Sequence, residues 1–308
     1  MTTASLRLPP TLHVLERGWL SSNNVVFDDG ETVSVVDTGY ATHAEQKVAL
    51  IRHAARGKPL ARIVNTHLHS DHVGGNAALR AATGARIVIP PGLADAVVRW
   101  DEEALSYAPT GQFCPRFMHD ATLAAGEVLR LGGLDWQVVA APGHDPHMVV
   151  LYCEDERILI SADALWEHGF GAIFPELEGE SGFAEQRAVL TWIARARPRL
   201  VIPGHGAPFT EVEAALERAA ARLEALAADP ERNARHVLRV LIKFWLLQVR
   251  ETTVDALFAH LLHTRYLRLI HARYFAQRAP AALLERALTE LVESGAAERR
   301  GQQVFDRG

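Results

Sequence analysis

The side chains best suited to chemistry in this chain are seven potential metal ligands, which lie in four short segments. The densest segment is Thr66–His72, where four such side chains fall within six positions. The other three follow apolar runs and stand beside glycine, proline or small residues, as is typical of tight loops after strands. In chain order the seven are His67, His69, Asp71, His72, His144, Asp163 and His205.

Five imidazoles and two carboxylates are enough to ligate two divalent ions of the zinc type. Two cations close together can bridge a water and lower its pKa toward neutrality, which makes a hydroxide nucleophile at ordinary pH. The same ions can polarise a carbonyl or phosphoryl oxygen. The chain shows no Gly-rich phosphate loop and no Ser-His-Asp pairing signature. The pattern therefore predicts metal-assisted hydrolysis.

The ligand set, in this order and spacing, resembles the metallo-β-lactamase fold hydrolases, and its motifs span residues 37 to 205. The resemblance implies an α/β fold, an αββα sandwich, with two metal ions. These would be two Zn²⁺, with Fe or Mn as alternatives. By resemblance one ion would be held by His67, His69 and His144, the other by Asp71, His72 and His205, and Asp163 would bridge them.

The resemblance also suggests roles for residues around the ligands. Asp71 would be both a ligand and the catalytic group that orients or moves a proton. Asp37, in Val36–Gly39, resembles the early strand-end aspartate of the family, which orients a ligand histidine. Three further side chains near the ligands in sequence are candidates for substrate contact, namely His147, Trp166 and His168.

Three functions remain open at this point. The leading one is hydrolysis of a small thioester, ester or lactone by a metal-bridged hydroxide. The second is cleavage of single-stranded RNA by an endoribonuclease-like phosphodiesterase, because some relatives with a similar C-terminal domain resemble endoribonucleases. The third is a persulfide-type dioxygenase with one iron, which would use fewer ligands than the seven present. Aromatic residues at 92–126 and 166–174 favour the acyl substrate over RNA.

The elements that must position the ligands are strands that end at them. Alternating apolar residues predict a hairpin at 25–36, a strand at 62–65 before the first ligands, and strands at 135–140, 148–153, 157–160 and 200–202. Helices are expected at 43–56, 76–82 and 183–197, and a helix with a long loop at 92–126 that could cover the metals. A strand followed by a functional loop and a helix is typical of layered α/β proteins.

After Thr210 the pattern changes to helical periodicity, with helices expected at 211–228, 230–250, 253–262 and 280–294 and a two-stranded wing at 295–305. We therefore expect a catalytic domain at 1–211 and a helical, winged-helix-like domain at 212–308. The second domain resembles that of the β-lactamase-like 2 and glyoxalase-II-like branches of the family. We expect it to form one wall of the active-site cleft or a homodimer interface.

Composition and charge indicate where the protein is located and which partners it binds. The first 25 residues lack a signal-peptide pattern, no apolar run reaches membrane-spanning length, and there are two cysteines. These features predict a cytoplasmic protein that does not associate with membranes. Residues 228–308 hold 13 Lys and Arg against 9 Asp and Glu, which gives this part a net charge of +4. Because the whole chain has a net charge of −5, residues 1–227 have a net charge of −9. An acidic catalytic part favours a small acyl substrate as partner, and RNA less.

Overall fold

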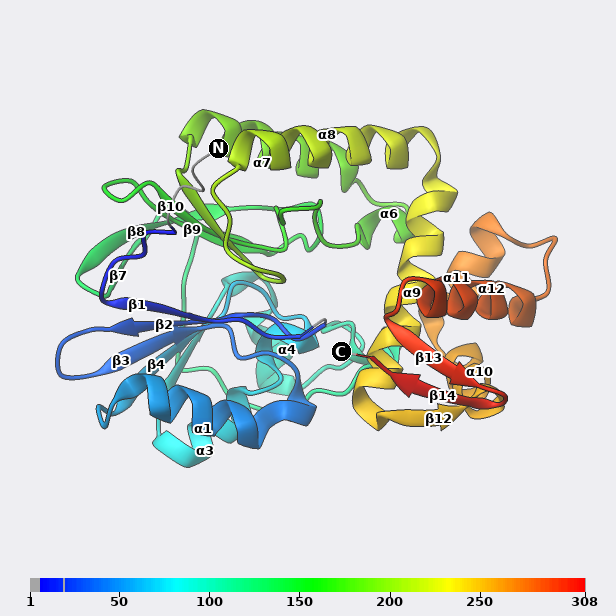
Figure 1. Ribbon diagram of the computed structural model, residues 1–308, viewed down its shortest axis with the longest axis horizontal. Helices are drawn as coiled ribbons and strands as arrows, with labels where there is room; N and C mark the ends of the chain where they lie inside the picture. The colour runs from blue at the N-terminus through cyan, green and yellow to red at the C-terminus, as the bar shows by residue number, and fades with distance from the viewer. Residues whose placement is uncertain (1–5, 19, 308) are drawn as a thin grey trace.

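The computed structural model describes residues 6–18 and 20–307. Its two largest sheets pack face to face, and helices cover both outer sides. Figure 1 shows α1 and α3 beneath one sheet and α7 and α8 above the other. The predicted αββα layering is therefore confirmed.

The first sheet has six strands in the order β1-β2-β3-β4-β5-β6. Its first three strands are antiparallel, and β3 to β6 run parallel. The expected hairpin is β2–β3, with Val25 opposite Val36. The strands are β1 (Leu12–Leu15), β2 (Asn24–Asp28), β3 (Val33–Val36), β4 (Leu60–Val64), β5 (Arg86–Ile89) and β6 (Ala121–Thr122).

The second sheet has the order β11-β10-β9-β8-β7 and is antiparallel except between β10 and β11. β7 was not predicted, although Leu129 and Leu131 are buried and alternate with exposed neighbours in the manner of an edge strand. The strands are β7 (Val128–Leu131), β8 (Leu134–Ala140), β9 (Val149–Cys153), β10 (Ile158–Ala162) and β11 (Leu200–Pro203).

The alternation of side chains along each strand explains the layers. In β2, Val25 and Phe27 face the core between the sheets, where Phe27 packs edge-on against Trp136 at 5.3 Å between ring centroids. Val26 points the other way and packs with Ile51 of α1. Both faces of the sheet are thus apolar and must be covered, which requires a sheet on one side and helices on the other.

The helices of the sandwich occur largely where they were expected. The segment 92–126, where a helix and a long loop were predicted, contains two short helices, α4 and α5, and another short helix follows Phe174. The helices are η1 (Ala41–His43), α1 (Ala44–Ala55), α2 (Ser70–Val73), α3 (Asn76–Thr83), η2 (Pro91–Leu93), α4 (Ala94–Arg99), α5 (Tyr107–Thr110), α6 (Pro175–Glu178), α7 (Phe183–Ala196) and α8 (Val212–Ala228).

The C-terminal region packs beside one end of the sandwich (Figure 1) and adds no described strand to either main sheet. The expected wing is the hairpin β13–β14, and β12 joins it to form a three-stranded sheet in the order β12-β14-β13. Helix α11 was missed, because its many Arg and His residues obscure a narrow buried stripe. The elements are α9 (Pro230–Val249), β12 (Glu251–Thr253), α10 (Val254–Leu262), α11 (Arg265–Tyr274), α12 (Pro280–Glu293), β13 (Ala297–Arg300) and β14 (Gln303–Asp306).

The division into domains stays a prediction, but core packing bears on its boundary. Ala215 and Leu223 of α8 lie in the core of the second sheet, together with Leu190 of α7. Leu238 and Leu241 of α9 lie instead in a separate core with α10, α11 and α12. Packing therefore favours a boundary between α8 and α9 rather than before α8. No helix among the described residues is long and apolar enough to cross a membrane.

Candidate metal centre

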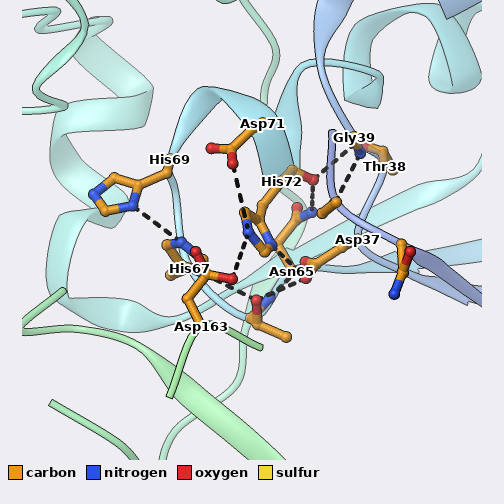
Figure 2. Close-up of polar contacts among 12 residues, drawn as sticks. Asp37, Thr38, Gly39, Asn65, His67, His69, Asp71, His72 and Asp163 are labelled. Carbon is orange, nitrogen blue, oxygen red and sulfur yellow. Dashed lines mark hydrogen bonds and ion pairs between the residues drawn. The ribbon is translucent and has the colours of Figure 1, made fainter. Parts of the chain in front are cut away.

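The seven predicted ligands come together at one edge of the sandwich, where several strands end. His67 to His72 follow β4, His144 follows β8, Asp163 follows β10 and His205 follows β11. Figure 2 shows His67, His72 and Asp163 pointing toward one another, the histidines from the segment after β4 and Asp163 from the end of β10. Gly204 permits this approach, because a Cβ there would lie 2.3 Å from Asp163 Oδ1. The ligands fall into two groups. The first consists of His67, His69 and His144, and the second consists of Asp71, His72, Asp163 and His205.

Three imidazole nitrogens converge in the first group. His69 Nδ1 lies 3.1 Å from His67 Nε2 and 2.8 Å from His144 Nε2. Ligands of a tetrahedral zinc ion bound at about 2.0–2.1 Å have nitrogens slightly more than 3 Å apart, so this spacing fits one metal ion. The group therefore has the ligand type and the spacing of a tris-histidine site.

Groups behind the imidazoles determine which ring nitrogen can bind a metal. His144 Nδ1 donates to the carbonyl oxygen of Ala172 at 2.6 Å, so its Nε2 keeps a free lone pair. Thr66 Oγ1 gives its proton to Asp37 Oδ2 at 2.8 Å and can therefore accept from His67 Nδ1 at 3.1 Å. That leaves His67 Nε2 as its ligand atom. These backing contacts are typical of metal sites.

His69 presents its Nδ1 atom, while its Nε2 lies 3.6 Å from Asp145 Oδ2. Sequence reasoning did not identify Asp145, Thr66 or the Ala172 carbonyl. Asp145 and Thr66 are direct neighbours of the ligands His144 and His67, which is the one signal that could have drawn attention to them.

The second group is built around Asp163. Its Oδ1 lies 3.3 Å from His72 Nε2 and 3.5 Å from His205 Nε2, and its Oδ2 lies 3.3 Å from His144 Nε2 of the first group. Asp71 Oδ2 lies 3.1 Å from His205 Nε2. One carboxylate thus faces both ligand groups, which is the position that the resemblance implied for a bridging residue.

Asp37 anchors this centre from behind, as the resemblance implied. Its Oδ2 accepts from His72 Nδ1 at 2.8 Å, and its Oδ1 accepts from the backbone N–H of Thr66 at 2.9 Å. Figure 2 shows Asp37 behind His72 on the side away from Asp71. His72 Nε2 is buried and faces Asp163, with no well-formed hydrogen bond among the described residues. A buried imidazole nitrogen that a carboxylate orients from behind fits a metal ligand.

Burial and neighbouring charges shift the pKa values of the two groups differently. Burial lowers the pKa of His67 well below its usual value and that of His144 to about 4, so both are neutral and ready to bind a cation. Burial also opposes the charged form of His205, but Asp163 and Asp71 outweigh it and raise the pKa to about 9. Burial opposes the charged form of His72 as well, yet the Asp163 and Asp37 carboxylates raise its pKa above the usual value.

We expect metal binding at neutral pH to release protons. His72 and His205 are protonated there in the metal-free protein, because their pKa values are raised, and a ligand imidazole must be neutral. Apparent affinity should therefore rise with pH through about 9, where His205 loses its proton without help. Titration of chelated protein with Zn²⁺ in buffers of different ionisation enthalpy measures the protons released. Binding without proton release at neutral pH would contradict these ionisation states.

The three candidate substrate residues fare differently. Trp166 Nε1 donates to Asp163 Oδ1 at 3.3 Å, and its ring lies 5.2 Å from the His205 ring, so it touches the metal centre. His147 is exposed and lines a cleft next to His144. The structure does not bring His168 to the site, because its side chain is 79% exposed and its nearest acid is Glu167 at 3.9 Å.

A small cavity of about 20 Å³ adjoins both ligand groups. Its walls include Gln112 from the 92–126 segment, which confirms that part of this segment covers the site. Sequence reasoning missed three wall residues from α9, namely His236, Val240 and Phe244. The C-terminal region therefore forms one wall of this cavity.

An open cleft of about 450 Å³ reaches the same ligands from outside, along His69 and His144. Phe174 lines both the cleft and the cavity, and its ring lies 5.6 Å from that of Tyr266 in α11. Carboxylates dominate the charged residues of the cleft, with Arg265 as the single Lys or Arg among the described residues that line it. The carboxylates are Asp101, Glu103, Asp145, Glu178 and Glu180.

Comparison with known proteins adds family information. Residues 17–221 match the family model described as the metallo-beta-lactamase superfamily. A hydroxyacylglutathione hydrolase of Methylococcus capsulatus is 34% identical over 132 residues, which are 43% of this chain and 42% of the relative. A second, from Methylobacterium sp., is 31% identical over 57% of this chain and 56% of its own. The chain thus spans about half the length of the curated relatives it matches.

Solved structures agree on the fold. A metallo-beta-lactamase family protein from Thermus thermophilus covers 98% of this chain and 100% of its own, with a TM-score of 0.54 and 21% identity. Another protein, solved in a di-iron-bound form, covers 67% of this chain and 98% of its own, with a TM-score of 0.54 and 25% identity. The full-length match includes the C-terminal region.

Proposed function

Since the chain belongs to the metallo-β-lactamase superfamily, we propose that it is a binuclear metal-dependent hydrolase of small thioesters. The observation that carries this proposal is the position of Asp163 between two separate groups of buried ligands. One group of ligands would suffice for a mononuclear iron oxygenase, so four further ligands argue for two ions. We propose Zn²⁺ for both, with Fe or Mn as alternatives, since one structural relative was solved with two irons.

Divalent ions held by the two groups would lower the pKa of a coordinated water and polarise the acyl oxygen. The side chains of the protein handle the proton, position the bridging carboxylate and provide apolar walls. Asp71, whose Oδ2 faces His205, holds or moves the proton of the attacking water. Trp166 holds Asp163 in place through its indole N–H. Phe174 and the α9 side chains Val240 and Phe244 give the cavity apolar walls beside the ligands, and Phe174 continues this apolar surface into the open cleft, where an acyl group would lie.

Charge along the cleft favours an acyl substrate over RNA. Five carboxylates against one arginine line the approach to the metal centre, and such a surface repels a polyanion. The curated relatives are named for hydrolysis of a hydroxyacylglutathione, which is a thioester. Esters and lactones share the same acyl chemistry and are secondary candidates. Cytoplasmic location and self-association remain proposals carried over from the sequence.

We expect kcat/KM for an acyl thioester panel to exceed that for single-stranded RNA by at least about tenfold, because the cleft repels phosphates. The assay compares thioesters, lactones and a short RNA at two salt concentrations with metal-loaded protein. Preference for RNA, with binding that weakens steeply as salt increases, would favour the nuclease instead. Oxygen consumption with a persulfide substrate and one bound iron would favour the dioxygenase.

A further inference from the structure

A second concave surface, of about 580 Å³, lies where α8, α9 and α12 meet. Four arginines dominate it, and we call it the arginine pocket. It adjoins the small cavity beside the two ligand groups, which we call the metal cavity, because His236 lines both. The polar side chains that define it are Arg222, Arg232, Arg235, Arg239, His236 and Glu290.

Arg222 is the partly buried arginine of this pocket that has no ion pair among the described residues. Its guanidinium lies over the Phe170 ring at 4.9 Å from the centroid, and among the described residues it has no ion pair or hydrogen bond. Burial lowers its pKa to about 10, and the charge of Arg239 contributes in the same direction. The group is still protonated at neutral pH. A partly buried cation without a counter-ion has already lost part of its hydration, which favours the binding of an anion from solution.

The neighbouring charges leave an excess of positive charge. Arg235 pairs with Asp229 at 3.3 Å and with Glu231 at 3.1 Å, and Glu290 pairs with both Arg239 and Arg286. Arg232 has no side-chain partner among the described residues and is exposed. Counting Arg222, Arg232 and these pairs gives five guanidiniums against three carboxylates, a net +2. That excess matches one dianion.

We propose that the arginine pocket binds the phosphate group of a small phosphorylated molecule. Guanidinium groups bind phosphate oxygens through two parallel hydrogen bonds, so Arg222 and Arg232 together could neutralise a phosphate dianion. His236 accepts a hydrogen bond at Nδ1 from Arg239 at 3.4 Å and also lines the metal cavity. A phosphate held here therefore lies one side chain from the metal cavity. This site is independent of the thioester proposal.

Calorimetric titration of the metal-loaded full-length protein with inorganic phosphate and with pyrophosphate tests the proposal. Phosphate can also bind metals, so the decisive comparison is between variants. Arg222→Met should weaken phosphate binding at one site by about tenfold or more, because charge-assisted hydrogen bonds are lost. The matched control is Arg195→Met, which removes an exposed arginine of α7 and should leave binding unchanged. If Arg222→Met does not fold, Arg232→Met at the exposed rim should weaken binding by several-fold.

Several results of these titrations would overturn the phosphate proposal. Binding that is equal in Arg222→Met, Arg232→Met and wild type would overturn the proposal. Acetate that binds in an Arg222-dependent way as tightly as phosphate would overturn the phosphate assignment. Arg222-dependent binding of single-stranded RNA without binding of phosphate or pyrophosphate would identify a nucleic-acid surface instead. Failure of thioester hydrolysis would leave these titrations unaffected, so the two proposals fail separately.

Discussion

Replacing Asp163 with alanine is expected to lower kcat/KM for thioester hydrolysis by about a thousandfold or more, because metal-assisted stabilisation of several kcal/mol depends on both ions. Asp163 faces ligands of both groups, with Oδ1 near His72 and Oδ2 near His144. Its removal should therefore reduce bound metal from two ions per chain toward one. Elemental analysis and steady-state kinetics measure the two effects together.

The fold should survive this change. Asp163 lies in a loop after β10, and its side chain contacts ligand histidines and Trp166. Asp135→Ala is the control, since Asp135 is 59% exposed and pairs with Arg130 on the surface. Wild-type protein that binds one ion at saturating metal would refute the binuclear site. Asp163→Ala protein with two ions and full activity would refute the bridging role.

Asp37→Asn is expected to weaken metal binding by about 10- to 100-fold, the usual loss when a carboxylate that orients a metal ligand is removed. Asp37 Oδ2 accepts from both His72 Nδ1 and Thr66 Oγ1. An amide nitrogen in that place would instead face two donors. The backbone should tolerate the change, because the φ of 56° at Asp37 is one that asparagine also adopts.

A second variant, Thr66→Val, shows which ligand group each contact of Asp37 supports. Thr66→Val removes the hydroxyl between Asp37 and His67 and leaves the contact between Asp37 and His72 intact. It should weaken the tris-histidine group alone, whereas Asp37→Asn should weaken both groups. Competition with a chelator, with the two ions resolved as separate steps, distinguishes these cases. Equal effects of the two variants on both steps would show that Asp37 does not act through two separate contacts.

Ligand types and local spacing were readable from the sequence because they are local properties. His67 to His72 lie next to one another in the chain, and the remaining ligands each follow an apolar strand. Strands such as β2, with apolar residues on both faces, require cover on both sides, so the layered fold also follows from the pattern. The β13–β14 hairpin could also be predicted, because its glycine turn is a local feature of the sequence.

Contacts between distant segments could not be read this way. The tautomer of His144 depends on a carbonyl 28 residues away, and that of His67 depends on Asp37 through Thr66. His168 was a candidate by its sequence position, yet the loop turns its side chain to solvent. His236 lies 31 residues after His205, and the packing of α9 against the sandwich brings it to the cavity.

The sequence by itself therefore determined the chemistry, a set of ligands for divalent ions on a layered α/β frame. Tertiary structure alone decided which groups back each ligand and which charges line the cleft. It also decided that α8 and α9 place Arg222 and Arg232, which have no ion pair among the described residues, in a pocket beside the metal cavity. The reason is physical. Ligand identity belongs to single residues, whereas desolvation, hydrogen-bond partners and local charge arise when segments far apart in the chain pack together.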